Sequence, residues 1–286
     1  MSRLAAIGVN APQIEYWNGP AGDKWARLAD SQDRMLEALG AAAMKACDIR
    51  PGHSVLDVGC GSGTSTIEIA RRVGDGGQVL GIDISTPMLD VGRERLSAHE
   101  FDNVTFENKD VTIYPFRETL FDRVFSRFGV MFFVEPISAF TNIRTGLKSG
   151  GRLAFVCWQA AEKNPWIAVP LRVVLQNVLA PPPADSEAPG PMAFSNPDRV
   201  RNILSEAGFS QIKIDALETL VPLEPDVSGS VQKLLEVGPV SRLLSGASDD
   251  VMKRVENDLS DAIAGFQTDQ GVMMGSATWI VSAISA

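Results

Sequence analysis

A glycine-rich turn carries the strongest chemical signal in this sequence. Residues 55–64 read VLDVGCGSGT, an apolar run followed by glycines at positions 59, 61 and 63. The pattern predicts a buried strand that turns into a helix, and a helix N-terminus reached in this way favours a bound ligand. A Cβ in such a turn would block the backbone dihedrals or the approach of the ligand. Gly59 and Gly61 are therefore binding candidates, although a strand–helix turn without a ligand would also use glycines.

Two acids near this turn narrow the kind of ligand. Asp57 lies two residues before the first glycine, where its carboxylate is expected to face the ligand. That charge would repel a dinucleotide pyrophosphate and attract a cation, and Thr64 stands where the GxGxxG pattern has its last glycine. Asp83, 24 residues after Gly59, ends the next apolar run and can accept two hydrogen bonds from a ribose diol. The alternative role for Asp83 is to cap the helix that begins near Pro87.

The elements that must position these residues alternate along the chain, which predicts a doubly wound α/β fold with a mostly parallel sheet. We expect strands at 53–58, 78–84, 104–108, 121–126 and 152–158, and helices at 64–73, 86–97 and 137–147. A helix over 22–47 precedes them. Helices at 166–179, 196–207 and 227–264 follow, with strands at 212–216 and 276–284. These two strands complete a seven-stranded sheet.

We expect a single domain in three parts: a helical N-terminal collar at 1–50, a cofactor-binding α/β core at 51–160, and residues 161–286, which hold the last two strands. The third part also contains two insertions, at 160–200 with Pro181, Pro182 and Pro183, and at 222–270. Segments that follow strands at the carboxyl edge of a sheet lie over the ligand crevice. We therefore predict that these two insertions, with the collar, form a lid that closes over the substrate and excludes water from the reaction. A peripheral helical decoration or a dimer interface is the alternative.

Composition excludes several classes of function. The 286 residues carry a formal net charge of −9, with no Lys/Arg-rich run, so a nucleic-acid partner is not expected. Cys47, Cys60 and Cys157 form no CxxC pair, which argues against a structural metal or a disulfide framework and fits the cytoplasm. Neither the start of the chain nor its apolar tail from residue 271 to 286 has the length of a membrane span or the pattern of an export signal.

Together these motifs resemble a known family. The run VLDVGCGSGT, the acid in GIDIS followed by PML, the step KDV at 109–111 and the segment FDRVFSRFGVMFF resemble the class I S-adenosylmethionine-dependent methyltransferases, nearest to the ubiquinone/menaquinone-biosynthesis-like group. The resemblance covers about residues 12–160. It implies S-adenosylmethionine as cofactor, whose sulfonium and ammonium charges suit a carboxylate at Asp57. It also implies O-, N- or C-methylation of a small organic acceptor.

The same resemblance assigns residues to the parts of the cofactor. It implies that Asp57, Gly59 and Gly61 hold the methionine part and that Asp83 holds the ribose. It implies further that Met88 packs on the adenine and that Asp110, with Val111 beside it, accepts a hydrogen bond from the adenine amino group. N-terminal aromatic residues lie over the cofactor in this group, so Tyr16, Trp17 and Trp25 are candidates. Hydrophobic docking of the collar is the alternative role for these three.

Residues 127–133, RFGVMFF, follow the expected fourth strand at the edge where ligands bind in such folds. Ser126 ends that strand and is a further cofactor-binding candidate. An apolar wall here would suit a flat or greasy acceptor, although aromatic residues after a central strand often belong to the core. The wall candidates, with Trp158 from the end of the fifth strand, are Phe128, Met131, Phe132, Phe133 and Trp158. Arg127 would bind a carboxylate or phosphate of the acceptor, or pair with a nearby acid. The segment lacks the (D/N/S)PP(Y/F) pattern of enzymes that methylate nucleobase amines.

No catalytic residue is predicted. His53 and His99 are the only histidines, and both are expected away from the ligand; Tyr16, Tyr114 and carboxylates of the lid stay open as proton acceptors. Positioning alone can supply roughly 7–11 kcal/mol of a transfer barrier. Two alternatives remain: a protein that binds the cofactor without catalysis, and an NAD(P)-dependent oxidoreductase, which Asp57 and Thr64 disfavour. The acceptor, the atom methylated and the oligomeric state are not predicted.

Overall fold

The computed structural model of this chain describes residues 4–116, 120–179 and 187–286. Within them, seven strands form one sheet in the order β3-β2-β1-β4-β5-β8-β6. The pairs β3–β2, β2–β1, β1–β4 and β4–β5 are parallel, and β8 is antiparallel to both β5 and β6. The doubly wound, mostly parallel sheet predicted from the sequence is thus confirmed. The strands are β1 (Ser54–Val58), β2 (Gln78–Asp83), β3 (Val104–Asn108), β4 (Phe121–Arg127), β5 (Leu147–Trp158), β6 (Phe209–Pro222) and β8 (Gly271–Ser285).

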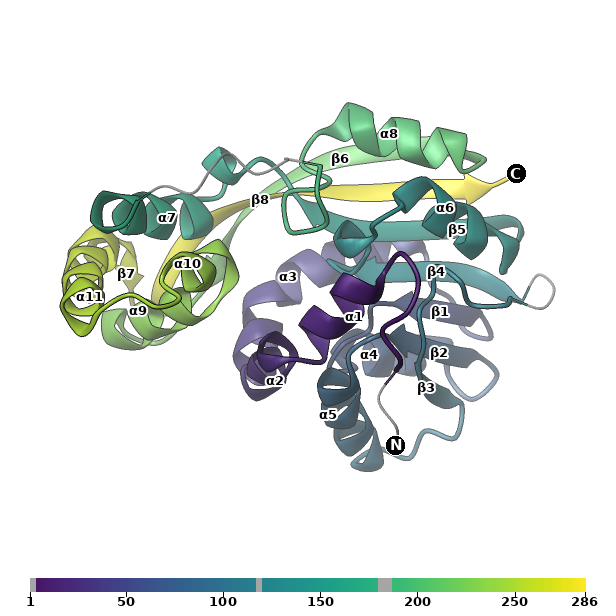
Figure 1. Cartoon of the computed structure of the whole chain (residues 1–286). Coiled ribbons are helices and arrows are strands. Elements are labelled where there is room, and N and C mark those ends of the chain that lie inside the picture. Colours follow the sequence, from purple (N-terminus) through teal and green to yellow (C-terminus); the bar gives the residue numbers. More distant parts are fainter. Residues whose placement is uncertain (1–3, 117–119, 180–186) are drawn as a thin grey trace.

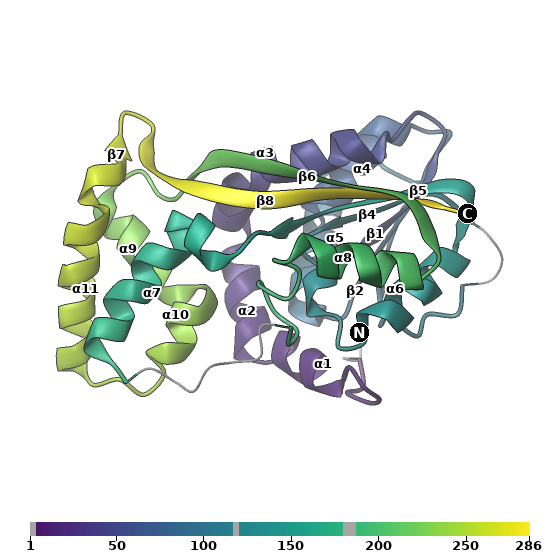
Figure 2. The ribbon, with the colours of Figure 1, turned by 90° about the horizontal axis from the view of Figure 1, so that it is seen from above.

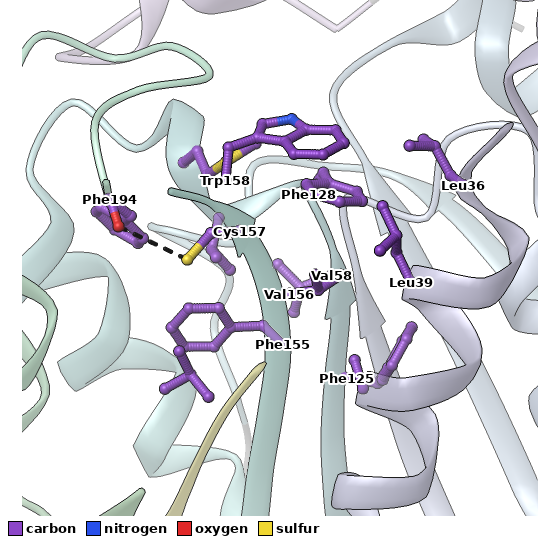
Figure 3. Close-up of a cluster of buried hydrophobic side chains, with 14 of the residues drawn as sticks. Leu36, Leu39, Val58, Phe125, Phe128, Phe155, Val156, Cys157, Trp158 and Phe194 are labelled. Carbon is purple, nitrogen blue, oxygen red and sulfur yellow. Dashed lines mark hydrogen bonds between the residues drawn. The ribbon is translucent and has the colours of Figure 1, made fainter. Parts of the chain in front are cut away.

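Helices cover both faces of the sheet. Figure 2 shows α3 and α4 on one side of the strands and α6 and α8 on the other. In Figure 3, Leu36 and Leu39 of α3 point toward Phe128, which follows β4, and these side chains are at most 9% exposed. The helices of this core are α3 (Ala29–Cys47), α4 (Thr64–Val73), α5 (Thr86–Ser97), α6 (Pro136–Thr145) and α8 (Pro197–Glu206).

The strands β6 and β8 extend well past the rest of the sheet. They pair with each other from Phe209 and Ser285 to Pro222 and Met273, whereas β5 pairs with β8 only as far as Thr278. The free part of this two-stranded ribbon leads to a group of helices at one end of the molecule (Figure 1), which we call the distal helices. They are α7 (Pro165–Asn177), α9 (Val227–Glu236), α10 (Gly238–Leu243) and α11 (Asp249–Ile263), and the two-residue strand β7 (Gln267–Thr268) pairs with β8 beside them.

Several sequence-derived boundaries were wrong. The helix expected at 22–47 is two helices, α2 (Pro20–Arg27) and α3, separated by Leu28, whose ψ of 7° departs from helical geometry. A short helix α1 (Ala11–Trp17) precedes them. Residues 227–264, expected to be helical, form α9, α10 and α11, with breaks at the extended Val237, which precedes Gly238 and Pro239, and before α11. The strands expected at 212–216 and 276–284 are longer, because β6 and β8 continue to pair with each other as far as Pro222 and Met273, past the end of β5.

Pro181, Pro182 and Pro183, singled out in the first insertion, lie outside the described residues. In the described part of the chain, no helix is both long enough and apolar enough to span a membrane.

Candidate functional site

A cavity of about 210 Å³ opens at the carboxyl edge of the parallel strands, between the core, the collar and the distal helices. Its walls come from three parts of the chain that are far apart in sequence. The strand ends and the turns after them contribute Gly59, Gly61, Asp83, Asp110 and Arg127; the collar contributes Asn10, Trp17, Trp25, Gln32 and Asp33; the distal helices and the loops beside them contribute Trp166, Ile167 and Val237. The cavity lies where ligands bind in doubly wound folds.

The glycine turn between β1 and α4 has the backbone that the sequence predicts. Gly59 and Gly61 have φ of 65° and 53°, in the region that favours glycine. A Cβ at position 59 would lie only 2.8 Å from Cα of Gly129, in the turn after β4. The turn therefore packs directly against the end of β4, and both glycines line the cavity.

Asp83, at the end of β2, anchors this turn. Its Oδ2 accepts a hydrogen bond from the backbone N–H of Gly61 at 2.8 Å, and its Oδ1 accepts from that of Ser85 at 2.7 Å. Burial raises the pKa of Asp83, while the bonds from Ser85 and Gly61 act in the opposite direction. The alternative role as a helix cap is wrong, because the cap of α5 is Ser85, whose Oγ accepts from the N–H of Met88. Asp83 lines the cavity and keeps lone pairs for a diol.

The expectation that Asp57 faces the ligand is corrected by the structure. Asp57 is fully buried and does not line the cavity. Its Oδ2 accepts from the hydroxyls of Ser65 and Thr66, both at 2.7 Å, in the first turn of α4. Burial, the largest influence, raises its pKa to about 6 in spite of these two bonds. Because side chains alternate along a strand, Asp57 points under the turn rather than out of the sheet edge.

Two further candidates also lie outside the cavity lining. Ser126 is fully buried, and its Oγ accepts from the backbone N–H of Gly129 at 3.2 Å, so it shapes the turn after β4. The ring of Tyr16 lies under the guanidinium of Arg242, 4.7 Å from the ring centroid. Tyr16 thus joins the collar to α10 and is not a wall of the cavity.

At the β3 side of the cavity, Asp110 is 7% exposed and fully engaged with neighbours. Its Oδ1 accepts from the N–H and the hydroxyl of Thr112 at 2.9 and 2.8 Å, and its Oδ2 accepts from Nδ2 of Asn10 at 2.8 Å. Met88 and Val111 also line the cavity. The contact to Asn10 ties the loop before α1 to the edge of the sheet.

Asp33 of α3, which sequence reasoning missed, accepts hydrogen bonds from several side chains of other elements. Its Oδ2 accepts from the hydroxyls of Ser62 and Thr64 at 3.1 and 2.7 Å and from Arg95 at 2.7 Å, and its Oδ1 binds Arg127. Burial by itself would raise the pKa of Asp33, but Arg127 and these hydrogen bonds hold it below its usual value. No local pattern marks Asp33, because its partners lie 29 to 94 residues away.

Arg127 therefore pairs with a nearby acid, one of the two roles that the sequence left open. Both Arg127 and Asp33 are 13% exposed and line the cavity. The pair joins the end of β4 to α3. Since the carboxylate of Asp33 neutralises the guanidinium, Arg127 is not an unpaired cation that is available to an anionic acceptor.

The acceptor candidates form an aromatic lining. Phe128, whose φ of 60° is unusual for a bulky residue, stacks on Trp158 with centroids 4.3 Å apart (Figure 3), and Trp158 contacts Trp166 at 4.9 Å. A second group joins Trp17 to Trp25 at 5.9 Å and to Phe132 at 5.1 Å. All six rings line the cavity, as do Met131 and Phe133. Most of the wall beyond the glycine turn is thus apolar and aromatic.

Neither histidine lines the cavity. His53 precedes β1 at the opposite edge of the sheet, where its Nδ1 accepts from the N–H of Arg50, and burial and Arg123 lower its pKa. His99 follows α5 and contacts Phe101. Among the described residues, the cavity lining holds no histidine, tyrosine or glutamate. The acids and arginine that it does hold are hydrogen-bonded to protein groups.

Comparisons with known proteins agree with this geometry. A family model described as a methyltransferase domain matches residues 49–178. The demethylmenaquinone methyltransferase of Symbiobacterium thermophilum is 30% identical over 166 residues, which cover 55% of this chain and 65% of that protein. Phosphoethanolamine N-methyltransferase 2 of Haemonchus contortus, solved in complex with S-adenosyl-L-methionine, superimposes with a TM-score of 0.58 at 18% identity, over 94% of this chain and 59% of that one. The YcgJ protein of Bacillus subtilis gives a TM-score of 0.57 at 16% identity, over 87% and 98%.

The structural likenesses support the fold, and the sequence matches support the family. The chain spans 65% of the Symbiobacterium protein and only 43% of a ubiquinone/menaquinone biosynthesis C-methyltransferase of Teredinibacter turnerae to which it is 40% identical. The matched segment contains the glycine turn, Asp83 and the step at 109–111 on which the resemblance was based. Residues 49–178 are therefore similar to a methyltransferase domain, and the sequence relatives of this chain are named as methyltransferases.

Proposed function

We propose that this protein transfers the methyl group of S-adenosylmethionine to a small organic acceptor with a flat, apolar body. The observation that carries the proposal is a single cavity whose lining combines two unlike sets of residues. The glycine turn and Asp83 suit a nucleoside with an amino-acid tail. The aromatic residues suit an acceptor ring. The curated relatives, named for methylation of demethylmenaquinone, support an acceptor of this kind.

In this proposal the chain's own residues act by binding and orientation. Gly59 and Gly61 allow the cofactor to approach the backbone, Asp83 accepts from the ribose, and the aromatic walls hold the acceptor in line and exclude water. The bound cofactor supplies the electrophilic methyl group. Nε1 of Trp166 is a buried donor without a partner among the described residues, so it can bind an oxygen of the acceptor.

The test is turnover on a panel of quinols, phenols and amines, with the methylated product and S-adenosylhomocysteine quantified by mass spectrometry. We expect both products in equal amounts with at least one planar acceptor. Tight binding of S-adenosylmethionine without turnover on any acceptor would instead favour a cofactor-binding protein without catalysis. Preferential binding of NADH would overturn the proposal in favour of an oxidoreductase.

The proposal includes the cytoplasm as the place of action and excludes nucleic acid as the acceptor. Three buried thiols, Cys47, Cys60 and Cys157, support a reducing compartment. The net charge of −9 disfavours contact with a phosphate backbone.

In this mechanism neither histidine accepts a proton from the acceptor. We predict that the double variant His53→Gln/His99→Gln folds and keeps turnover within about threefold of the original, because neither imidazole lines the cavity. Steady-state rates and a thermal melt check this. A loss of about a hundredfold or more in kcat with an unchanged melt, the scale of general acid–base catalysis, would contradict it.

We further propose that the distal helices act as a lid that handles the acceptor. Trp166 and Ile167 of α7 and Val237 between α9 and α10 line the cavity. Their polar contacts with the collar include two weak ones, Arg27 with Glu236 at 2.7 Å and Nζ of Lys24 with Ser241 at 3.3 Å, and a buried one, in which Nζ of Lys233 donates to the backbone oxygen of Ser31 at 3.1 Å. Exposed pairs contribute little stability, so opening of the lid would mainly cost the buried contact of Lys233.

The lid predicts a selective defect. Trp166→Ala should raise the KM for the acceptor about tenfold or more, because it removes an aromatic wall and an N–H donor, while the affinity for S-adenosylmethionine by calorimetry changes less than threefold. Leu175→Ala, on the exposed side of the same helix, is the matched control and should change neither quantity. An equal loss of both affinities in Trp166→Ala would count against a lid that handles the acceptor.

A further inference from the structure

Two collar side chains that line the cavity are buried with an unpaired polar atom. In the described part of the chain, Oδ1 of Asn10 and Nε2 of Gln32 have no hydrogen-bond partner. The two residues are 5% and 6% exposed. A buried polar atom without a partner costs about 1–3 kcal/mol, and native structures rarely keep one without a reason. A ligand of matching polarity would recover this free energy.

The amide orientation of Asn10 is fixed by its neighbours. Its Nδ2 donates to Oδ2 of Asp110 and to Oγ1 of Thr112, both at 2.8 Å. The reverse orientation would place the amide oxygen against a carboxylate, which accepts hydrogen bonds and cannot donate them when ionised. The unpaired atom of Asn10 is therefore an acceptor, at the side of the cavity where Asp110 follows β3.

Gln32 of α3 lines the same cavity. The next residue on α3, Asp33, is saturated by Ser62, Thr64, Arg95 and Arg127. No hydrogen bond of the described structure holds the side-chain amide of Gln32, so this amide can turn its Nε2, a donor, toward a ligand in the cavity.

These polarities match the two ends of the cofactor that the proposed function requires. Adenine carries an amino group, a donor, and the methionine end carries a carboxylate, an acceptor. We propose that Oδ1 of Asn10 accepts a hydrogen bond from the adenine amino group and that Nε2 of Gln32 donates to the α-carboxylate. Asp110 then acts as a positioning residue that holds Asn10, and the collar determines specificity for both ends of the cofactor. This inference rests on the proposed function.

The test is calorimetry with three ligands: S-adenosylhomocysteine, its analogue with hydrogen in place of the adenine amino group, and its analogue without the carboxylate. The original protein should bind each analogue about tenfold more weakly, or worse, than S-adenosylhomocysteine. Asn10→Ala should bind the analogue without the adenine amino group about as well as S-adenosylhomocysteine. It should still bind the analogue without the carboxylate more weakly. Gln32→Ala should show the opposite pattern, so each variant is the control for the other.

Gln32→Glu sharpens the test, because it places a carboxylate where we assign the donor. Gln32→Glu should bind S-adenosylhomocysteine more weakly than Gln32→Ala does. It should bind the analogue without the carboxylate no more weakly than Gln32→Ala does. If the substitutions only disturb the collar, the affinities for all three ligands will fall by the same factor and the ratios between them will not change. That result would overturn the inference. Failure of the original protein to bind S-adenosylhomocysteine at all would overturn the proposed function instead.

Discussion

Replacement of Asp83 by alanine is expected to weaken S-adenosylmethionine binding by a factor of about 100 to 10,000. Under the proposed function, the carboxylate accepts two hydrogen bonds from the ribose, each about 1.5–3 kcal/mol when the acceptor is charged. Their sum, about 3–6 kcal/mol, converts to that range of affinity. The loss is compounded because Asp83 also accepts from the N–H groups of Gly61 and Ser85, which shape the turn under the ligand.

Calorimetry measures this effect directly, and Asp90→Ala provides the matched control. Asp90 lies on α5, is exposed and pairs only with Arg93 in the described structure, so its loss removes the same charge and the same atoms outside the cavity. The affinity of Asp90→Ala for S-adenosylmethionine should stay within about twofold of that of the original protein. Apo-state melts of both variants separate a binding defect from a folding defect. An Asp83→Ala protein that is folded and binds within threefold of the original would refute the assignment of Asp83 to the ribose.

The parts of the fold that sequence predicted well are those with local signals. The bounds of α4, α5 and β3 agree with the expected 64–73, 86–97 and 104–108, because hydrophobic periodicity and a following turn determine them within one segment. The glycine turn was also recognised, since its positive φ angles demand a residue type that is visible in the sequence.

The features that sequence reasoning missed depend on contacts between distant segments. Asp33 has its role only because α3 crosses the end of β4 and the start of α4, and Asn10 only because the loop before α1 reaches Asp110. Asp57 was placed on the wrong side of the turn, since a pattern of glycines and an acid does not say which way the strand faces. The long ribbon of β6 and β8 was underestimated because it depends on pairing between two strands that are distant in sequence, which no local pattern records.

Asp57 gives the second large expected effect, a pH dependence of stability. Its pKa is raised to about 6 in the folded protein against an ordinary value of 3.8. Between these values the folded state holds more protons than the unfolded state, so this group makes stability fall as the pH rises from about 4 to about 6. Above pH 7 the charged, buried carboxylate should cost on the order of 3 kcal/mol. Asp57→Asn, neutral at every pH, should lack this loss.

Denaturant unfolding of both proteins at pH 4.5 and pH 7.5 measures the effect as a double difference, which cancels every other titrating group. Asp57→Asn should gain stability relative to the original at the higher pH. Parallel pH profiles for the two proteins would show that Asp57 titrates normally in the folded state.

The charge of Asp57 lowers the stability of the protein, but it would interact favourably with a sulfonium cofactor bound at the glycine turn. At neutral pH Asp57 is ionised in a dry site, and its unpaired Oδ1 faces no protein donor among the described residues. A cation bound above the turn would relieve part of that penalty through the low-dielectric interior. Asp57→Asn should therefore bind S-adenosylmethionine, which carries the sulfonium, more weakly relative to uncharged-sulfur S-adenosylhomocysteine than the original protein does. An unchanged ratio of the two affinities in calorimetry at pH 7.5 would show that the Asp57 charge serves the fold and not the cofactor.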